Sequence, residues 1–109
     1  MLHQTNAFTY YADKETFDSK NHFGWIKQVP SKDNQKINPD NKKEFQHILS
    51  KQIASCDIRA IKIDYMEAHY KDGSSEQIKL PFIRPRLEVV PGTPKEKIYN
   101  WLCSGKSSN

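Results

Sequence analysis

IRAIKIDYMEAHYKDGSSEQIKLPFI, residues Ile58–Ile83, is the stretch that decides the fold expected for this chain. Asp72 and Gly73 near its centre favour a tight turn, because both central residues of a type I′ hairpin turn need positive φ. The stretch is therefore predicted to be a long β-hairpin with a two-residue loop. A three-residue loop is rejected, because it would place Asp64 opposite Phe82 on the buried side.

With that loop, the side chains of the hairpin alternate between two faces. One face is apolar and is expected to form the core: Ile61, Ile63, Tyr65, Ile78, Leu80 and Phe82. The other face has mixed polarity, and four residues are expected to meet another protein there: Met66, Ala68, Tyr70 and Ile83. Apolar parity changes early in the first strand, which a bulge near Ala60 or burial on both sides would explain. Pro81 cannot donate a ladder hydrogen bond, so the second strand is expected to be an edge.

Two helices are expected outside the hairpin. Asn38, Pro39 and Asp40 suit the start of a helix, and apolar residues follow at helical spacing. These apolar residues are Phe45, Ile48, Leu49, Ile53 and Cys56, and they predict a helix over about residues 39–55. Thr93 and Glu96 have the spacing of a capping box, which predicts a short helix over about 94–103 and a frayed tail at 105–109.

The N-terminal part is rich in aromatic residues, and segments 7–12 and 23–29 have the composition of strands. A helix over residues 7–17 also fits the spacing, but a strand is favoured. The expected fold class is α+β: a small antiparallel sheet, made from N-terminal strands and the hairpin, with one longer helix and one short helix packed on one face. The 109 residues fit a single domain, 1–109.

The composition argues against a dedicated nucleic-acid binder. The net charge is +4, and it divides evenly, with +2 in residues 1–56 and +2 in residues 57–109. The basic residues are 14 Lys and 3 Arg, whereas arginine is the better reader of phosphate and guanine. One local basic cluster, Lys79, Arg84 and Arg86, keeps the alternative open, with Trp25 as a stacking surface. A charged edge that prevents sheet aggregation explains the cluster equally simply.

The N-terminal residues MLHQTNAF show no secretory signal, and no apolar run reaches a transmembrane length. We therefore expect a cytoplasmic protein without membrane contact. In that compartment Cys56 and Cys103 are expected to be buried reduced thiols, although a single disulfide between them remains open.

Glu67 and His69 are the catalytic candidates, because a carboxylate and an imidazole on one face of the hairpin suit acid–base chemistry or metal binding. Spacing supplies no third ligand, so a half-exposed polar network is favoured, and no metal or cofactor is expected. Phosphate loops and the common catalytic motifs are absent from the sequence.

These observations favour a small, non-enzymatic protein-interaction module. Its partner is another protein or a second copy, reached through the outer face or edge of the 58–83 hairpin. The alternatives are a nucleic-acid-binding protein that uses the basic cluster, and a small hydrolase or ligand-binding protein around Glu67 and His69.

Overall fold

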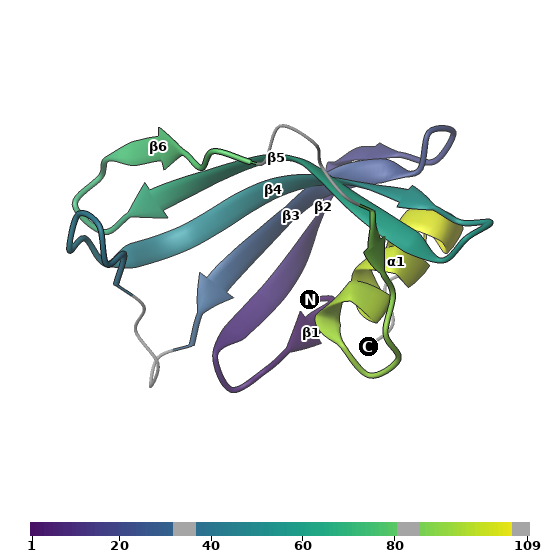
Figure 1. The fold of residues 1–109 in the computed structure, drawn as a ribbon, viewed down its shortest axis with the longest axis horizontal. Coiled ribbons are helices and arrows are strands. Elements are labelled where there is room, and N and C mark those ends of the chain that lie inside the picture. The colour runs from purple at the N-terminus through teal and green to yellow at the C-terminus, as the bar shows by residue number, and fades with distance from the viewer. Residues whose placement is uncertain (32–36, 81–85, 106–109) are drawn as a thin grey trace.

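The computed structural model describes residues 1–31, 37–80 and 86–105, which form one curved antiparallel sheet with a helix packed against one side (Figure 1). The strands run in the order β1-β2-β3-β4-β5-β6, and β7 pairs with β5. The elements are β1 (His3–Gln4), β2 (Phe8–Asp18), β3 (Phe23–Pro30), β4 (Phe45–Ser55), β5 (Ala60–Tyr70), β6 (Ser75–Gln77), β7 (Leu87–Glu88) and α1 (Pro94–Ser104). The strands expected near 7–12 and 23–29 are confirmed as parts of β2 and β3.

The helix expected over 39–55 is wrong, and with it the α+β class: most of this segment is the central strand β4, so the fold is mainly β. Ile48 and Leu49 share one side of a helix but lie on opposite faces of a strand. The positions of β4 that face α1 include Ser50 and Gln52, which are buried although polar. Gln52 Nε2 donates a hydrogen bond to Ser50 Oγ at 2.9 Å, so these two buried polar side chains are hydrogen-bonded to each other. Pairing with two neighbouring strands outweighs the helical spacing.

The residues expected to start that helix form a turn instead. Asn38 Oδ1 accepts a hydrogen bond from the Asp40 amide at 2.9 Å, as it would at a helix N-cap. The chain then reverses, because the Lys42 amide donates to Asn38 O and the Asn38 amide donates to Lys43 O. Lys42 has a φ of 62°, which ends any helical continuation. Asparagine and aspartate favour turns as strongly as caps, so the signal was ambiguous.

The expected hairpin is present as β5 and β6, but its loop has three residues rather than two. The Tyr70 amide donates to Ser74 O, the Gly73 amide donates to Tyr70 O, and Gly73 has a φ of 89°. A left-handed third residue is typical of three-residue hairpin loops. We had rejected this loop because it would pair Asp64 with Phe82. That pairing is not part of the β5–β6 ladder, because β6 ends at Gln77. The expected partner of Asp64, Phe82, lies outside the described residues.

A bulge near Asp64 divides β5 into two halves with opposite parity. Gln52 pairs with Ile63 and Lys51 pairs with Tyr65, so Asp64 is the extra residue of β5. Ile61 and Ile63 therefore face α1, as expected. Tyr65 lies on the other face, so its assignment to the core was wrong. We expected a bulge near Ala60, but the bulge lies four residues further along the chain, at Asp64.

The C-terminal helix is confirmed as α1, and it carries the core. Its buried residues are Ile98, Tyr99, Trp101 and Leu102. They pack with residues from five strands or their flanks: Leu2, Ile26, Ala54, Ile61 and Val89. The helix ends at Gly105, which has a φ of 75° and whose amide donates a hydrogen bond to Trp101 O. Both features are typical of a left-handed C-cap. The Thr93 hydroxyl donates to Val90 O rather than capping the helix.

Cys56 and Cys103 form a disulfide, with Cα atoms 5.9 Å apart, so the expectation of reduced thiols is wrong. The bond ties the end of α1 to the residue that follows β4. Tyr99 strengthens this junction, because its hydroxyl donates to Cys56 O at 2.7 Å. Within the described ranges, no helix is long and apolar enough to cross a membrane.

Replacing Gly24 with alanine is predicted to destabilise the fold by about 1–3 kcal/mol through overpacking. A Cβ atom at Gly24 would lie 2.6 Å from Trp101 Cη2 and 2.8 Å from Cζ3, closer than van der Waals contact allows. Urea unfolding of Gly24→Ala, Trp101→Phe and the double variant measures the coupling between the two positions. Strictly additive effects would contradict the close approach.

Removing the disulfide is predicted to cost about 2–4 kcal/mol, because it closes a loop between residues 47 positions apart. Cys56→Ser/Cys103→Ser should unfold at lower urea concentration than the wild type, and its midpoint should not respond to reductant. The wild-type midpoint should fall when reductant is added. Thiol titration of the denatured, unreduced protein should find no free thiol, and two free thiols would refute the pairing.

Candidate binding site on the open face of the sheet

The sheet face opposite α1 is a candidate binding surface, because the only helix among the described residues packs on the other side. We call this surface the open face. Two rows of side chains cross it, as the strand register shows. One row is Asp13, Trp25, Lys51 and Tyr65, and the next is Tyr11, Lys27, Leu49 and Glu67. Both rows mix aromatic, aliphatic and charged side chains.

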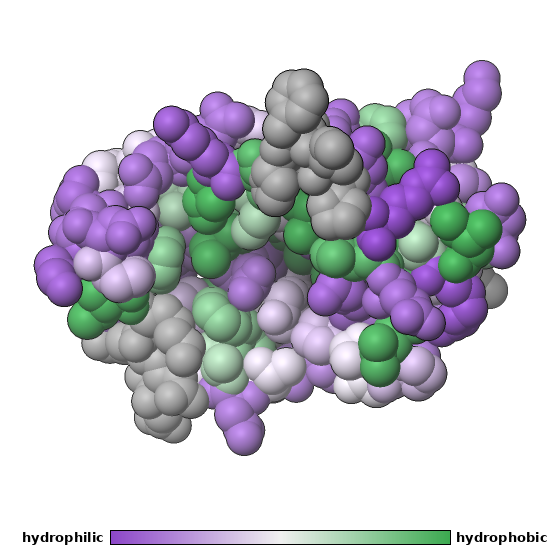
Figure 2. All heavy atoms as spheres, in the orientation of Figure 1, coloured by the Kyte–Doolittle hydropathy of each residue, from purple (hydrophilic) through white to green (hydrophobic). Residues whose placement is uncertain are grey.

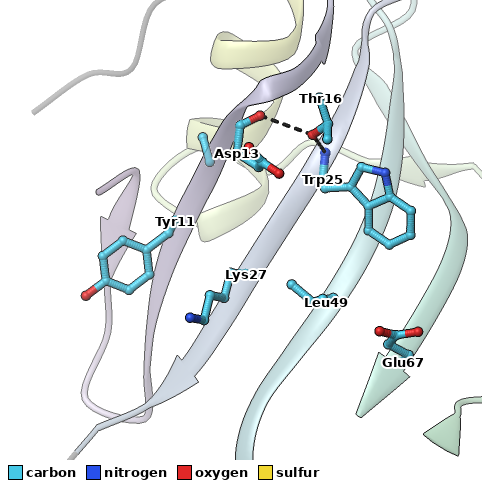
Figure 3. Close-up of a pocket in the computed structure, with 8 residues that line it drawn as sticks. Tyr11, Asp13, Thr16, Trp25, Lys27, Leu49 and Glu67 are labelled. Carbon is cyan, nitrogen blue, oxygen red and sulfur yellow. Dashed lines mark hydrogen bonds between the residues drawn. The ribbon is translucent and has the colours of Figure 1, made fainter. Parts of the chain in front are cut away.

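A hollow of about 380 Å³ lies over these rows (Figure 3). Its lining residues come from β2, β3, β4 and β5: Tyr11, Ala12, Asp13, Thr16, Trp25, Lys27, Leu49 and Glu67. Figure 3 shows the indole of Trp25 between the carboxylates of Asp13 and Glu67, with the Lys27 ammonium toward Tyr11. We call this hollow the Trp25 hollow.

Trp25 is held from two sides. The register of β2 against β3 shifts between Asp13 and Asp18, and this irregularity brings Thr16 to the Trp25 backbone. The Thr16 hydroxyl accepts a hydrogen bond from the Trp25 amide at 3.3 Å and donates to Asp13 O at 3.2 Å (Figure 3). The Tyr65 ring meets the indole edge-on, with centroids 5.5 Å apart and an interplanar angle of 70°. The backbone of Trp25 is therefore tied to β2, and its indole, packed against Tyr65, forms one wall of the hollow.

Glu67 is oriented by its neighbours on the same strand. The Tyr65 hydroxyl donates to Glu67 Oε2 at 2.8 Å, and His69 Nε2 lies 2.6 Å from Glu67 Oε1. The hydrogen bond from Tyr65 is the main cause that lowers the pKa of the Glu67 carboxyl, followed by the bond to His69. Because an ionised carboxylate only accepts, His69 Nε2 is the donor.

A second imidazole stacks on His69. The His47 and His69 rings are 4.4 Å apart at an interplanar angle of 13°. Burial lowers the pKa of His47, and the nearby charges of His69 and Lys27 lower it further. Neutral imidazole is thus the favoured form of His47 near neutral pH.

The catalytic candidates Glu67 and His69 do meet, as spacing suggested. Their hydrogen bond is one of two that Glu67 accepts, the other being from the Tyr65 hydroxyl. Together these two bonds orient the Glu67 carboxylate. Within the described residues, no three histidine, cysteine or acidic side chains lie close enough together to hold a metal ion. A catalytic role for Glu67 and His69 stays a prediction.

Three of the four residues expected at an interface lie on the other face of the sheet. Met66, Ala68 and Tyr70 are on the face that carries α1, because the Asp64 bulge reverses the parity of β5. Ala68 and Tyr70 are buried, with exposures of 0% and 2%. Asn38 Nδ2 donates to the Tyr70 hydroxyl at 2.8 Å, which ties the hairpin to the preceding turn. Ile83 lies outside the described residues.

The basic cluster and Trp25 are not neighbours in the sheet order. Lys79 follows β6 and Arg86 precedes β7, both beyond the outer side of β5, and both residues are exposed. Strands β4 and β5 lie between them and Trp25 on β3. Arg84 lies outside the described residues.

Sequence reasoning selected Trp25 and Glu67 but missed Tyr11, Asp13, Lys27 and Leu49. Alternation within β2 and β3 was the available signal: Tyr11 and Asp13 share a face, as do Trp25 and Lys27. Leu49 was hidden by the helical interpretation of its segment.

The other face has a smaller hollow of about 240 Å³, where the first turn of α1 meets the sheet. Tyr10, Gln28, Ile63 and Ile98 are among its lining residues. Figure 2 shows apolar side chains gathered around the hollowed middle of the molecule in this view.

No protein-family model matches this chain, and no curated protein is similar to it in sequence. Among solved structures it resembles Haemophilus influenzae protein E, crystal form II, with a TM-score of 0.62 over 96% of this chain and 93% of that chain. The two sequences are 14% identical, so the resemblance concerns the fold alone.

Replacing Tyr65 with phenylalanine is predicted to raise the pKa of Glu67, because it removes the strongest hydrogen bond to the ionised carboxylate. An NMR titration of the Glu67 side-chain carboxyl carbon measures this. A lowered pKa stabilises the fold above the ordinary carboxyl pKa, and this contribution is lost as pH falls through the lowered value. Tyr65→Phe should therefore be less sensitive to acid in this range. Tyr11→Phe on the same face is the control, and an equal shift there would refute the assignment.

Proposed function

We propose that this protein is a non-enzymatic interaction module that binds a protein partner through the open face of its sheet. The observation that carries the proposal is the Trp25 hollow, in which an indole packed against Tyr65 lies beside charged groups on a face that α1 leaves uncovered. Tryptophan and tyrosine dominate binding energy at protein interfaces. Few polar groups around an apolar wall are typical of recognition sites.

This proposal moves the expected interface on β5 from Met66, Ala68 and Tyr70 to Tyr65, Glu67 and His69. Burial of Ala68 and Tyr70 is the reason, because a buried side chain offers no surface to a partner. Self-association through the hairpin stays a prediction, with a second copy as one candidate partner.

The nucleic-acid alternative has weaker support. Asp13 and Glu67 beside Trp25 repel phosphate, and Lys79 and Arg86 lie on the far side of β5. A single strand stacked on Trp25 would gain little from those two cations.

We further propose that the protein works in an oxidising compartment. The Cys56–Cys103 disulfide supports this, since such bonds are rare in the cytosol and persist outside it. The cytoplasmic location expected from the N-terminal residues stays a prediction, and the disulfide counts against it.

A selection from a library of random linear peptides tests the interaction proposal. Peptides retained by the wild type should bind Trp25→Ala at least about tenfold more weakly, because the indole would be a central contact. Ile58→Ala, which removes an exposed apolar side chain from the β4–β5 turn, should bind within about twofold of the wild type. Circular dichroism checks that both variants stay folded. Selected peptides that bind Trp25→Ala as tightly as the wild type would overturn the proposal.

A further inference from the structure

The charged residues that line the Trp25 hollow have a net negative charge, whereas the whole chain has a net positive charge. Two acids and one lysine line it, whereas the chain has a net charge of +4. The single lysine, Lys27, points its ammonium toward Tyr11 and away from the indole (Figure 3). Both carboxylates that line the hollow, those of Asp13 and Glu67, flank Trp25, and they suit a cation.

Glu67 is prepared to accept further hydrogen bonds. An ionised carboxylate has about four acceptor positions, and the bonds from Tyr65 and His69 use one on each oxygen. Within the described part of the chain, each oxygen thus keeps one position for a partner. Because Tyr65 and His69 already fix the carboxylate, binding a partner costs little side-chain entropy.

Trp25 offers an aromatic surface that attracts a cation. The indole is the strongest cation–π acceptor among the side chains. The protein already uses this interaction on the same face, where Lys51 Nζ lies 4.5 Å from the Phe23 ring centroid. Lys51 is a cross-strand neighbour of Trp25, but its ammonium is directed to Phe23. Among the described residues, the Trp25 ring contacts the Tyr65 ring in a T-shaped arrangement.

We propose that the Trp25 hollow binds an arginine side chain of a protein partner, stacked on Trp25 and hydrogen-bonded to Glu67. The inference rests on the proposed function and names the partner's chemistry. A planar guanidinium stacks on an indole and donates two parallel bonds to a carboxylate, which matches the two free positions of Glu67. Lysine carries the same charge without the planar fork and binds more weakly. Asp13, on the other flank of the indole, adds attraction.

The test is an NMR titration of the ¹⁵N-labelled protein with N-acetyl-arginine N-methylamide. The indole N–H signal of Trp25 should shift and saturate. The indole of Trp101, which is 1% exposed, should not respond and serves as an internal reference. The citrulline analogue, which has a similar shape without the charge, should bind about tenfold more weakly, as expected when a charge-assisted pair and a cation–π contact are lost. Equal binding of the two analogues would overturn the proposal.

Matched variants locate the effect. Glu67→Gln keeps the shape and removes the charge, and it should weaken arginine binding about tenfold. Glu96→Gln makes the same change beside Arg59, whose Nη2 lies 3.8 Å from Glu96 Oε2, and it should leave binding unchanged. Unchanged binding in Glu67→Gln would refute the role of this carboxylate.

Two further probes cover other classes of ligand. Methyl glucoside and a thymidine oligonucleotide should not shift the Trp25 signal. A saturable shift with either probe, and none with the arginine probe, would overturn the proposal in favour of that class.

The outcome also separates this inference from the proposed function. Peptides that need Trp25 but contain no arginine would refute the arginine site and keep the interaction module. Binding of the arginine probe, together with selected peptides that bind Trp25→Ala as tightly as the wild type, would keep the arginine site and refute the proposed interaction module.

Discussion

The close approach of Trp101 to Gly24 is the contact on which the rest of the structure depends. Trp101 is 1% exposed, and its ring occupies the space in which any larger residue at position 24 would place its Cβ atom. This contact sets α1 directly on the sheet and decides which face becomes the core. The Cys56–Cys103 bond and the Tyr99 hydroxyl hold the same helix at its C-terminal half. Because α1 has only 11 residues, it covers part of one face, and no helix among the described residues packs on the opposite face.

Several side chains of the open face interact with one another. Glu67 accepts from Tyr65 and His69, the two imidazoles stack, and Lys51 lies over Phe23. Exposed aromatic rings that are partnered by charges present less bare apolar surface than aliphatic residues would. Such a surface favours a partner with matching polar groups over general hydrophobic contact.

The sequence predicted those elements whose signals are local. The short helix α1 and the aromatic strands β2 and β3 are examples. It failed for β4, because Ser50 and Gln52 occupy buried positions and remove the alternation that marks a strand. It also placed Tyr65 in the core, because the alternation of Ile61 and Ile63 was extended unchanged past the one-residue bulge at Asp64. Trp25 and Glu67 were each recognisable as polar or aromatic residues of interest. Their meeting in one hollow depends on the register of β3, β4 and β5, which single-strand patterns do not contain.

After the Asp64 bulge, the residues of β5 fall into two sets that lie on opposite faces of the sheet. Met66, Ala68 and Tyr70 face the side of α1, while Tyr65, Glu67 and His69 face outward. Because the two sets face opposite sides of the sheet, the outer side chains can be replaced without removing a side chain from the inner packing. The same division makes the domain a natural scaffold for engineered binders, in which the outer set is randomised together with Trp25 while the disulfide and the inner set maintain the fold.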